Sequence, residues 1–238
     1  MIYIKANKRK LLSWTGLCRS SFVAENIKIP TIQGVNWLER IKMTRLILAS
    51  GSPRRRELLS VFDFDIEVVK PQILEVIDKN LTPGEIVKSL AMQKGEAVVK
   101  KLGSTDAPVL SADTIVVESG EILGKPADRA DAVRIISRLS GRTHEVFTGV
   151  AIFYKDKTKN FFVRSEVVFR DLTRDEIESY CDLKEPYDKA GAYAIQGTAG
   201  FMIRSASGSY SNIIGLPVCE VAEAFRDLKI KFGVNKNG

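Results

Sequence analysis

The sequence predicts an α/β fold with a mixed sheet and flanking helices. From Arg45 onward, short apolar runs typical of buried strands alternate with amphipathic helical segments. Two later strand segments are separated only by the polar turn KDKTKN, which predicts an antiparallel pair within the sheet. The 238 residues suffice for one large domain or for two small lobes around a shared cleft.

The first half of this pattern has clear helix starts. Ser52 is a suitable N-cap before Pro53, and residues 82–85 (TPGE) form a capping box with proline in the first helical position. The expected elements are a strand at Arg45–Ala49, a helix at Pro53–Phe62, a strand at Ile66–Val69, a helix from Thr82 to about Leu102 and a strand at Val109–Val117.

The second half continues the alternation. Residues 173–176 (TRDE) form another capping box. Gly141 is placed to end the helix predicted at Asp128–Leu139. The expected elements are a helix at Asp128–Leu139, strands at Glu145–Tyr154 and Phe161–Phe169, a short helix after Thr173, a strand at Gly200–Ser205 and a helix at Val218–Leu228.

Charge is unevenly distributed along the chain. The net charge of the chain is +7. Residues 1–42 hold eight basic and two acidic side chains, so residues 43–238 have a net charge of only +1. The near-neutral charge of residues 43–238 argues against nucleic-acid binding. Any functional basic side chains in this part must therefore be clustered locally, as in a phosphate site. No apolar run approaches the roughly 18 residues of a membrane span. The three cysteines lack metal or disulfide spacing, which favours a reducing, cytoplasmic compartment.

Residues 1–42 stand apart from the body of the chain at 43–238. They are basic, and Met43 comes directly before the first strand. Three interpretations remain open: translation from an upstream start codon with Met43 as the working start, a targeting peptide, or a surface extension.

The segment Ser50–Arg55 joins the first strand to the first helix. Free backbone N–H groups at a helix start attract anions, and two serine hydroxyls and two arginine side chains add donors. The segment is therefore either a phosphate site or an ordinary helix start with surface arginines. The GxxxxGK[ST] pattern of a Walker loop is absent.

Two charged residues fall at positions where burial is expected. Asp113 shares a strand face with Ile115 and Val117, where a carboxylate needs a cation, a metal or hydrogen bonds. It is either a structural acceptor or a general base. Lys94 lies on the apolar stripe of its helix, four residues after Leu90, so it either extends to solvent or meets an anion.

Four other polar residues stand out in the sequence. Lys125 lies in a Gly-Lys-Pro turn, and Lys189 precedes small residues that permit close backbone approach. The amide of Gln196 matches the N3–H and a carbonyl of uracil or thymine, unless it is a plain surface group. The single histidine, His144, is interpreted as a structural hydrogen-bonding residue, because no GxSxG elbow accompanies it.

Six ordered segments resemble the Maf family, also called septum formation inhibitor proteins. Within about residues 45–228 they read LILASGSPRRRELL, LAMQKGEAV, SADTIVV, GKPADRADAVRIISRLSGRTHEVFTGVAI, EPYDKAGAYAIQG and SYSNIIGLP. Residues 1–42 lie outside the family pattern, and Gly95 stands where the family usually has alanine. The resemblance implies two lobes around a central nucleotide cleft, similar to inosine triphosphatase, and a homodimer.

The resemblance also implies an activity and a set of roles. A nucleoside triphosphate would be hydrolysed between its α and β phosphates with the help of a divalent cation, Mg²⁺ or Mn²⁺. Asp113 would activate water and hold the metal together with Glu75, whose neighbourhood matches the family only loosely. The phosphate ligands would be Ser50, Ser52, Arg55, Lys94, Lys125 and Lys189.

Three positions bear on the choice of base. Arg54, Thr114 and Gln196 resemble the branch of the family that acts on dTTP and UTP. The branch that acts on 7-methyl-GTP has a bulky aromatic residue in place of the first arginine. A 7-methyl-GTP pyrophosphatase and a nucleotide-binding regulator of cell division without catalysis remain as alternatives.

Overall fold

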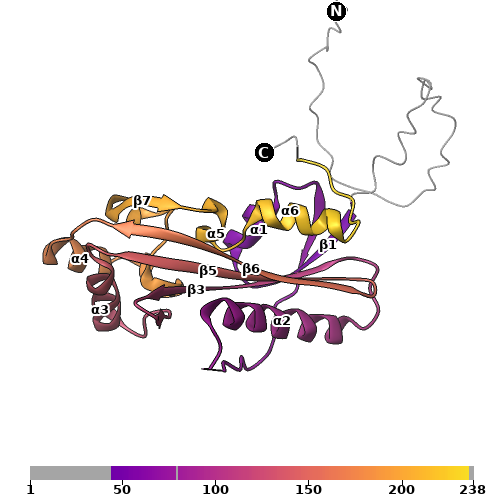
Figure 1. Cartoon of the computed structure of the whole chain (residues 1–238), viewed down its shortest axis with the longest axis horizontal. Coiled ribbons are helices and arrows are strands. Elements are labelled where there is room, and N and C mark those ends of the chain that lie inside the picture. The colour runs from indigo at the N-terminus through magenta and orange to yellow at the C-terminus, as the bar shows by residue number, and fades with distance from the viewer. Residues whose placement is uncertain (1–43, 79, 236–238) are drawn as a thin grey trace, which may run out of the picture. The chain divides into compact units, whose positions relative to one another are not determined.

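The described part of the chain forms a seven-stranded mixed sheet with helices packed against it (Figure 1). This computed structural model describes residues 44–78 and 80–235, and the interpretations of residues 1–42 concern residues outside that part. The strand order is β2-β1-β3-β5-β6-β7, with β4 paired to β3. β1 pairs in parallel with β2 and β3, whereas the remaining pairs are antiparallel. The predicted mixed α/β sheet is confirmed.

The helices and strands follow the predicted order. The strands are β1 (Thr44–Ala49), β2 (Phe64–Val68), β3 (Val109–Glu118), β4 (Glu121–Leu123), β5 (Thr143–Tyr154), β6 (Lys157–Phe169) and β7 (Ile203–Ser207). The α-helices are α1 (Pro53–Leu59), α2 (Pro83–Leu102), α3 (Arg129–Leu139), α4 (Arg174–Cys181), α5 (Tyr210–Ile214) and α6 (Val218–Asp227). Three 3₁₀ helices complete the described part: η1 (Glu185–Asp188), η2 (Ala190–Ala192) and η3 (Thr198–Met202). Both predicted capping boxes are present, at Thr82 and Thr173.

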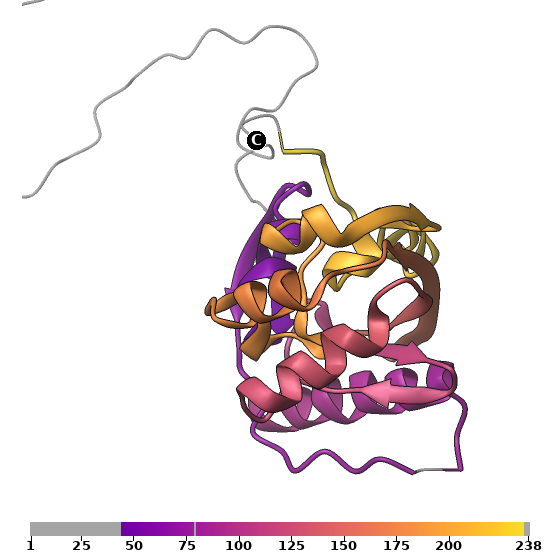
Figure 2. The ribbon, with the colours of Figure 1, turned by 90° about the vertical axis from the view of Figure 1, so that its left-hand side faces the viewer.

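The two lobes are the two ends of one continuous sheet. Leu110 of β3 packs in a core with α6, whereas Val116 of the same strand packs in a separate core with α3 and α4. Thr114 lies between them and contacts Thr148 of β5. Figure 1 shows these helices at opposite ends of the long strands, and Figure 2 shows the connection between β2 and α2 running outside α2. Two apolar cores therefore flank a polar middle.

Helix α2 packs so closely on β3 and β5 that its backbone contacts the backbone of the sheet. A Cβ atom added at Gly149 of β5 would lie 2.1 Å from the Val87 carbonyl oxygen of α2. Ser111 of β3 donates a hydrogen bond of 2.7 Å to the Ala91 carbonyl oxygen one turn further along. The close approach requires the small residue, and it fixes which α2 side chains face β3.

Gly95 extends the same close packing. A Cβ atom there would lie 2.1 Å from an edge carbon of Phe153, whose ring occupies the space above the glycine. The alanine that the family usually has at this position would thus clash with Phe153 in this chain. The glycine and the phenylalanine ring are complementary in volume.

Several predicted boundaries differ from the observed ones, for example at the start of β2, which is Phe64 and not Ile66. The helix from Pro53 ends at Leu59 instead of Phe62, because the Phe62 ring packs edge-on against Phe225 and Phe232. The strand expected at Gly200–Ser205 begins only at Ile203 and extends to Ser207. The residues before it form η3, whose first backbone N–H groups donate to the Glu185 carboxylate.

The hairpin between β5 and β6 is tighter than the sequence predicts. Tyr154 pairs directly with Lys157, so only Lys155 and Asp156 form the turn, with Lys155 at a φ of 55°. The other residues of the KDKTKN segment belong to β6. The short elements β4, α5 and η1–η3 were not predicted.

Substituting Gly149 by alanine tests the close packing of α2. The added methyl group has to displace helix backbone, so we expect Gly149→Ala to lower the free energy of unfolding by about 1–3 kcal/mol. Urea denaturation measures this change. The matched control is Gly200→Ala, because the nearest atom to its added Cβ is 3.9 Å away. Equal stabilities of the two variants would contradict the packing described.

Candidate functional site

A pocket opens at an exposed edge of β3, between the two apolar cores. β1 pairs with β3 only as far as Ala49 opposite Ser111, and β4 begins to pair at Val116. Between these two points β3 pairs with β5 on one side only, and among the described strands none covers its other edge at Asp113 and Thr114. The pocket has a volume of about 520 Å³, in the usual range for a small-molecule site.

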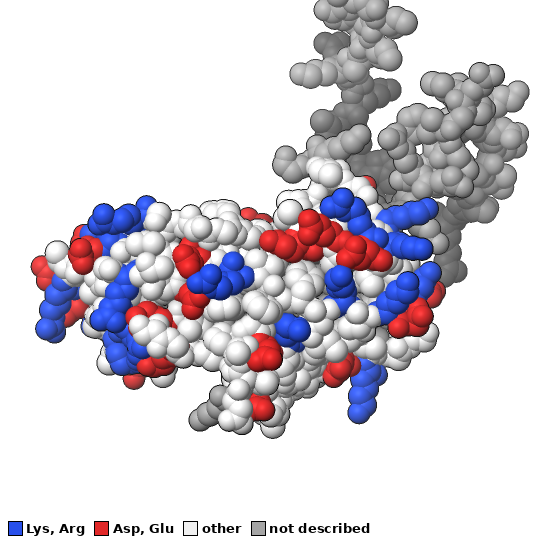
Figure 3. Space-filling view, viewed as in Figure 1, with Lys and Arg blue, Asp and Glu red and all other residues white. Residues whose placement is uncertain are grey.

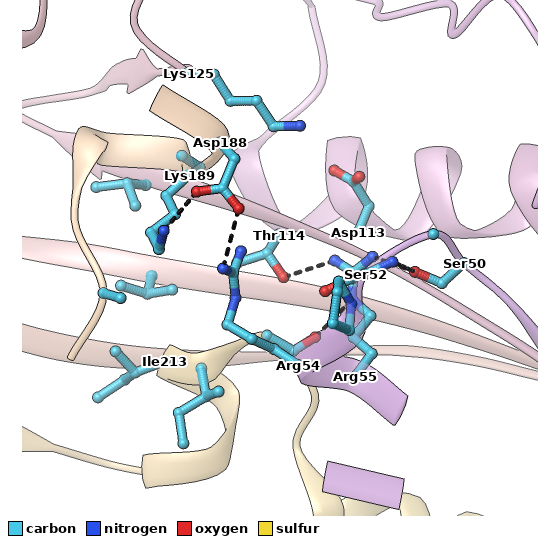
Figure 4. Close-up of a pocket in the computed structure, with 18 of the residues that line it drawn as sticks. Ser50, Ser52, Arg54, Arg55, Asp113, Thr114, Lys125, Asp188, Lys189 and Ile213 are labelled. Carbon is cyan, nitrogen blue, oxygen red and sulfur yellow. Dashed lines mark hydrogen bonds and ion pairs between the residues drawn. The ribbon is translucent and has the colours of Figure 1, made fainter. Parts of the chain in front are cut away.

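All eleven residues predicted for the site line this one pocket, and Figure 4 labels most of them. They come from the β1–α1 connection, α1, the β2–α2 connection, α2, β3, the β4–α3 connection and the segment after η1. They are Ser50, Ser52, Arg54, Arg55, Glu75, Lys94, Asp113, Thr114, Lys125, Lys189 and Gln196. The fold thus brings together residues up to 146 positions apart (from 50 to 196).

Lys94 lies between two carboxylates. Its Nζ atom contacts Asp113 Oδ1 and lies 3.0 Å from Glu75 Oε1. The Lys94 and Asp113 side chains are 12% and 13% exposed, whereas Glu75 is 42% exposed at the rim. Lys94 therefore meets anions instead of extending to solvent, and the ion pair compensates much of the desolvation of Asp113.

Arg55 is held by three hydrogen bonds from three directions. It donates to the Gly215 carbonyl oxygen at 2.9 Å, to Ser50 Oγ at 3.2 Å and to Thr114 Oγ1 at 3.1 Å. Burial lowers the pKa of Arg55, and the nearby Asp113 carboxylate opposes that change. An arginine remains charged despite such a shift, and it has five N–H donors. Two N–H donors are therefore left over from these three bonds.

The two serines beside Arg55 differ in their contacts. Ser50 is 4% exposed and accepts hydrogen bonds from Arg55 and from the backbone N–H of Ser52. Ser52 occupies the predicted N-cap position before Pro53, but its side chain makes no capping hydrogen bond. Its hydroxyl is thus not committed to the helix.

Asp188 joins two cations on the opposite side of the pocket. Its carboxylate lies 3.4 Å from Arg54 and accepts from Lys189 Nζ at 2.5 Å (Figure 4). Lys189 also donates to the Glu185 carbonyl oxygen at 2.7 Å. Partial burial acts to raise the pKa of Asp188, but Lys189 and Arg54 lower it overall. This bridge connects α1 to the segment after η1.

Sequence reasoning missed Lys70 and Asp188 as site residues. Lys70 follows β2 and lays its aliphatic chain near Gly51, 3.6 Å from the position of an added Cβ atom. With these two, six basic and three acidic residues line the pocket. Acidic side chains lie among the basic ones on the face seen in Figure 3. The positive excess of the pocket is therefore local, as expected for a phosphate site.

The remaining wall of the pocket is apolar. Val116, Val146, Ile213 and the ring of Tyr193 line it, and Tyr193 Oη lies 2.8 Å from His144 Nε2. His144 is fully buried, so its structural interpretation is confirmed by the geometry. Gln196 is exposed at this wall. A flat apolar group with polar edges, such as a nucleobase, fits these surroundings.

The carboxylates fit a hard divalent cation. Glu75 and Asp113 both reach the same Lys94 ammonium, so a cation at that point would meet oxygen ligands. Among the described residues, no three His, Cys, Asp or Glu side chains cluster as a complete metal site. Mg²⁺ usually takes one or two protein carboxylates and completes its shell with water and substrate phosphates, so two suffice.

Comparison with known proteins identifies the family. The sequence profile described as Maf-like protein matches residues 45–228. The chain belongs to the Maf family. Proteins named dTTP/UTP pyrophosphatase from Bacillus cereus (strain Q1) and Bacillus anthracis are each 45% identical over 188 residues. These alignments cover 79% of this chain and 97% of each relative.

Two further findings concern the fold of this Maf family member. The solved structure of the Staphylococcus aureus Ham1 protein aligns with a TM-score of 0.41 and 15% identity, covering 78% of this chain and 100% of that one. No helix within the described ranges is long and apolar enough to cross a membrane.

His144 makes the stability of the protein depend on pH. Burial lowers its pKa from 6.5 to about 4, so folding favours the neutral imidazole. Its contribution is fully present above pH 6.5 and is lost as the pH falls towards 4. We expect the free energy of unfolding to drop by about 3 kcal/mol between pH 7 and pH 4 from this group.

Denaturant unfolding at several pH values measures this contribution. His144→Leu serves as the reference, because it removes the titrating group and keeps an apolar side chain in the site. The difference between wild type and variant should shrink or reverse as the pH falls from 7 to 4. A difference that stays constant over this range would contradict the neutral, buried state of His144.

Proposed function

We propose that the chain is a nucleoside triphosphate pyrophosphatase that hydrolyses dTTP and UTP to the monophosphate and pyrophosphate. The observation that carries the proposal is the pairing of Asp113 with Lys94 inside a pocket with a local excess of positive charge. The Bacillus relatives named dTTP/UTP pyrophosphatase support the choice of substrate.

The phosphate chain binds along the basic side of the pocket. Its ligands are Ser50, Ser52, Arg55, Lys94, Lys125 and Lys189. Arg55 and Ser50 are preorganised by their mutual hydrogen bond, and the free Ser52 hydroxyl adds a donor. Fixed donors stabilise the charge that develops on the phosphoryl oxygens without reorganising during the reaction.

Asp113 accepts the proton of the attacking water. Its carboxylate is mostly shielded from solvent and held by Lys94, so its position is defined before the substrate binds. Asp113 and Glu75 are the residues that would hold a divalent cation, Mg²⁺ or Mn²⁺. When bound, such an ion polarises a phosphoryl oxygen and neutralises negative charge. Lys94 lies beside both carboxylates and is itself one of the proposed phosphate ligands.

The base lies against the apolar wall, where Gln196, Arg54 and Thr114 select it. The exposed Gln196 amide pairs with the N3–H and a carbonyl of the pyrimidine. Thr148 donates its proton to the Asn212 carbonyl oxygen, so Thr114 donates to Thr148 and accepts from Arg55. Thr114 therefore also orients Arg55, one of the proposed phosphate ligands.

An assay of pyrophosphate release with Mg²⁺ or Mn²⁺ tests the function. UTP, dTTP, CTP, GTP and 7-methyl-GTP are compared at equal concentration. We expect UTP and dTTP to be hydrolysed fastest. Fastest hydrolysis of 7-methyl-GTP would instead assign the chain to the other branch. Nucleotide binding without pyrophosphate release would favour a regulator of cell division.

Replacing Asp113 by asparagine separates chemistry from binding. Asparagine keeps the size of the side chain but cannot accept the proton, so we expect kcat for UTP to fall about 10²- to 10⁴-fold. UTP binding, measured by calorimetry, should persist. Asp106→Asn, at an exposed aspartate outside the pocket, is the matched control. Retained turnover by Asp113→Asn would exclude Asp113 as the base.

A further inference from the structure

The connection between β2 and α2 carries Glu75 into the pocket with little support of its own. Residues 71–78 contain no helix or strand, and although Pro71 and Ile73 are half-buried, the other apolar side chains are exposed. Leu74 is 95% exposed, Val76 69% and Ile77 51%. Burial of these side chains therefore does not hold the segment, and some other contact must place the Glu75 carboxylate.

Gln93 of α2 supplies that contact. Its side-chain amide accepts a hydrogen bond from the Val76 backbone N–H at 2.9 Å and donates one to the Val76 carbonyl oxygen at 2.8 Å. The same amide nitrogen lies 3.1 Å from Ser89 Oγ, which fixes the side chain against its own helix. The amide thus pairs with Val76 as a neighbouring strand would.

Within the described part of the chain, the two hydrogen bonds between Gln93 and Val76 are those that join residues 71–78 to α2. The ion pair from Glu75 to Lys94 is the other tie. Because Gln93 and Lys94 are consecutive on α2, the helix that carries the lysine also fixes the backbone beside its partner carboxylate. Gln93 itself does not line the pocket.

We propose that Gln93 is a positioning residue for Glu75. This inference rests on the proposed function, because Glu75 is one of the two carboxylates assigned to the divalent cation. Glutamine suits the role, since one planar amide both donates and accepts at the spacing of a backbone N–H and C=O. Loss of such supporting contacts around a metal ligand typically costs about 10- to 100-fold in affinity or activity.

The test compares four forms of the full chain: wild type, Gln93→Ala, Glu75→Gln and the double variant. Gln72→Ala is the matched control, because Gln72 lies exposed on the same segment and outside the pocket lining. The readouts are kcat and KM for UTP, the Mg²⁺ concentration at half-maximal activity, Mn²⁺ binding by calorimetry and hydrogen exchange of the Val76 amide.

For Gln93→Ala, we expect fast exchange of the Val76 amide and about a 10- to 100-fold weaker Mn²⁺ affinity. We also expect a matching rise in the half-maximal Mg²⁺ concentration, with little change in the KM for UTP at saturating Mg²⁺. The double variant should behave as Glu75→Gln, because Gln93 acts only through Glu75. Gln72→Ala should match wild type.

Three outcomes would overturn the proposal: a protected Val76 amide in Gln93→Ala, unchanged Mn²⁺ affinity, or effects of the two substitutions that multiply in the double variant. A wild-type protein without turnover would instead refute the proposed function. The exchange and Mn²⁺ measurements need no turnover, so they distinguish the two failures.

Discussion

The seating of α2 on the sheet at backbone distance is the constraint on which the site depends. Gly149 admits the Val87 carbonyl group, and Ser111 ties the Ala91 carbonyl one turn later. From this closely packed helix, the Lys94 ammonium contacts the Asp113 carboxylate of β3. Removing that closeness would separate the two charges and leave a carboxylate in an apolar layer.

The same helix organises more than one charge. Lys94 pairs with Asp113 from the sheet and with Glu75 from a segment that has no regular structure. On the opposite side, Asp188 pairs with Arg54 and Lys189. Carboxylates of the protein thus neutralise the basic side chains that would bind the proposed triphosphate. Binding then exchanges one set of anions for another, which limits the repulsion among the basic side chains.

Rigidity and mobility are distributed unequally around the pocket. Arg55 is fixed by Gly215, Ser50 and Thr114, and the chain of hydroxyl groups continues to Thr148 in the sheet. In the β2–α2 connection, in contrast, Leu74, Val76 and Ile77 are exposed to solvent. The proposed phosphate ligands Arg55 and Ser50 are therefore well fixed, whereas one proposed metal ligand comes from a segment that depends on few contacts.

The sequence predicts most of this architecture because its signals are local. Capping boxes locate α2 and α4, and the unusual placement of Asp113 and Lys94 within apolar patterns marks two charges that the structure pairs. Asp188 and Lys70 were missed because their contacts are made across the fold. The bridge from Arg54 to Asp188 spans 134 positions, which no periodicity reveals. β4 and α5 have three and five residues, too few to show a period.

The coupling between Lys94 and Asp113 in the folded protein is the most direct test of this account. Free energies of unfolding are measured for wild type, Lys94→Met, Asp113→Asn and the double variant. The account predicts that the double variant is more stable than the sum of the single changes implies, with a coupling free energy of about 1 kcal/mol or more. Additive effects would show that the two residues do not interact, and would contradict the seating of α2 described above.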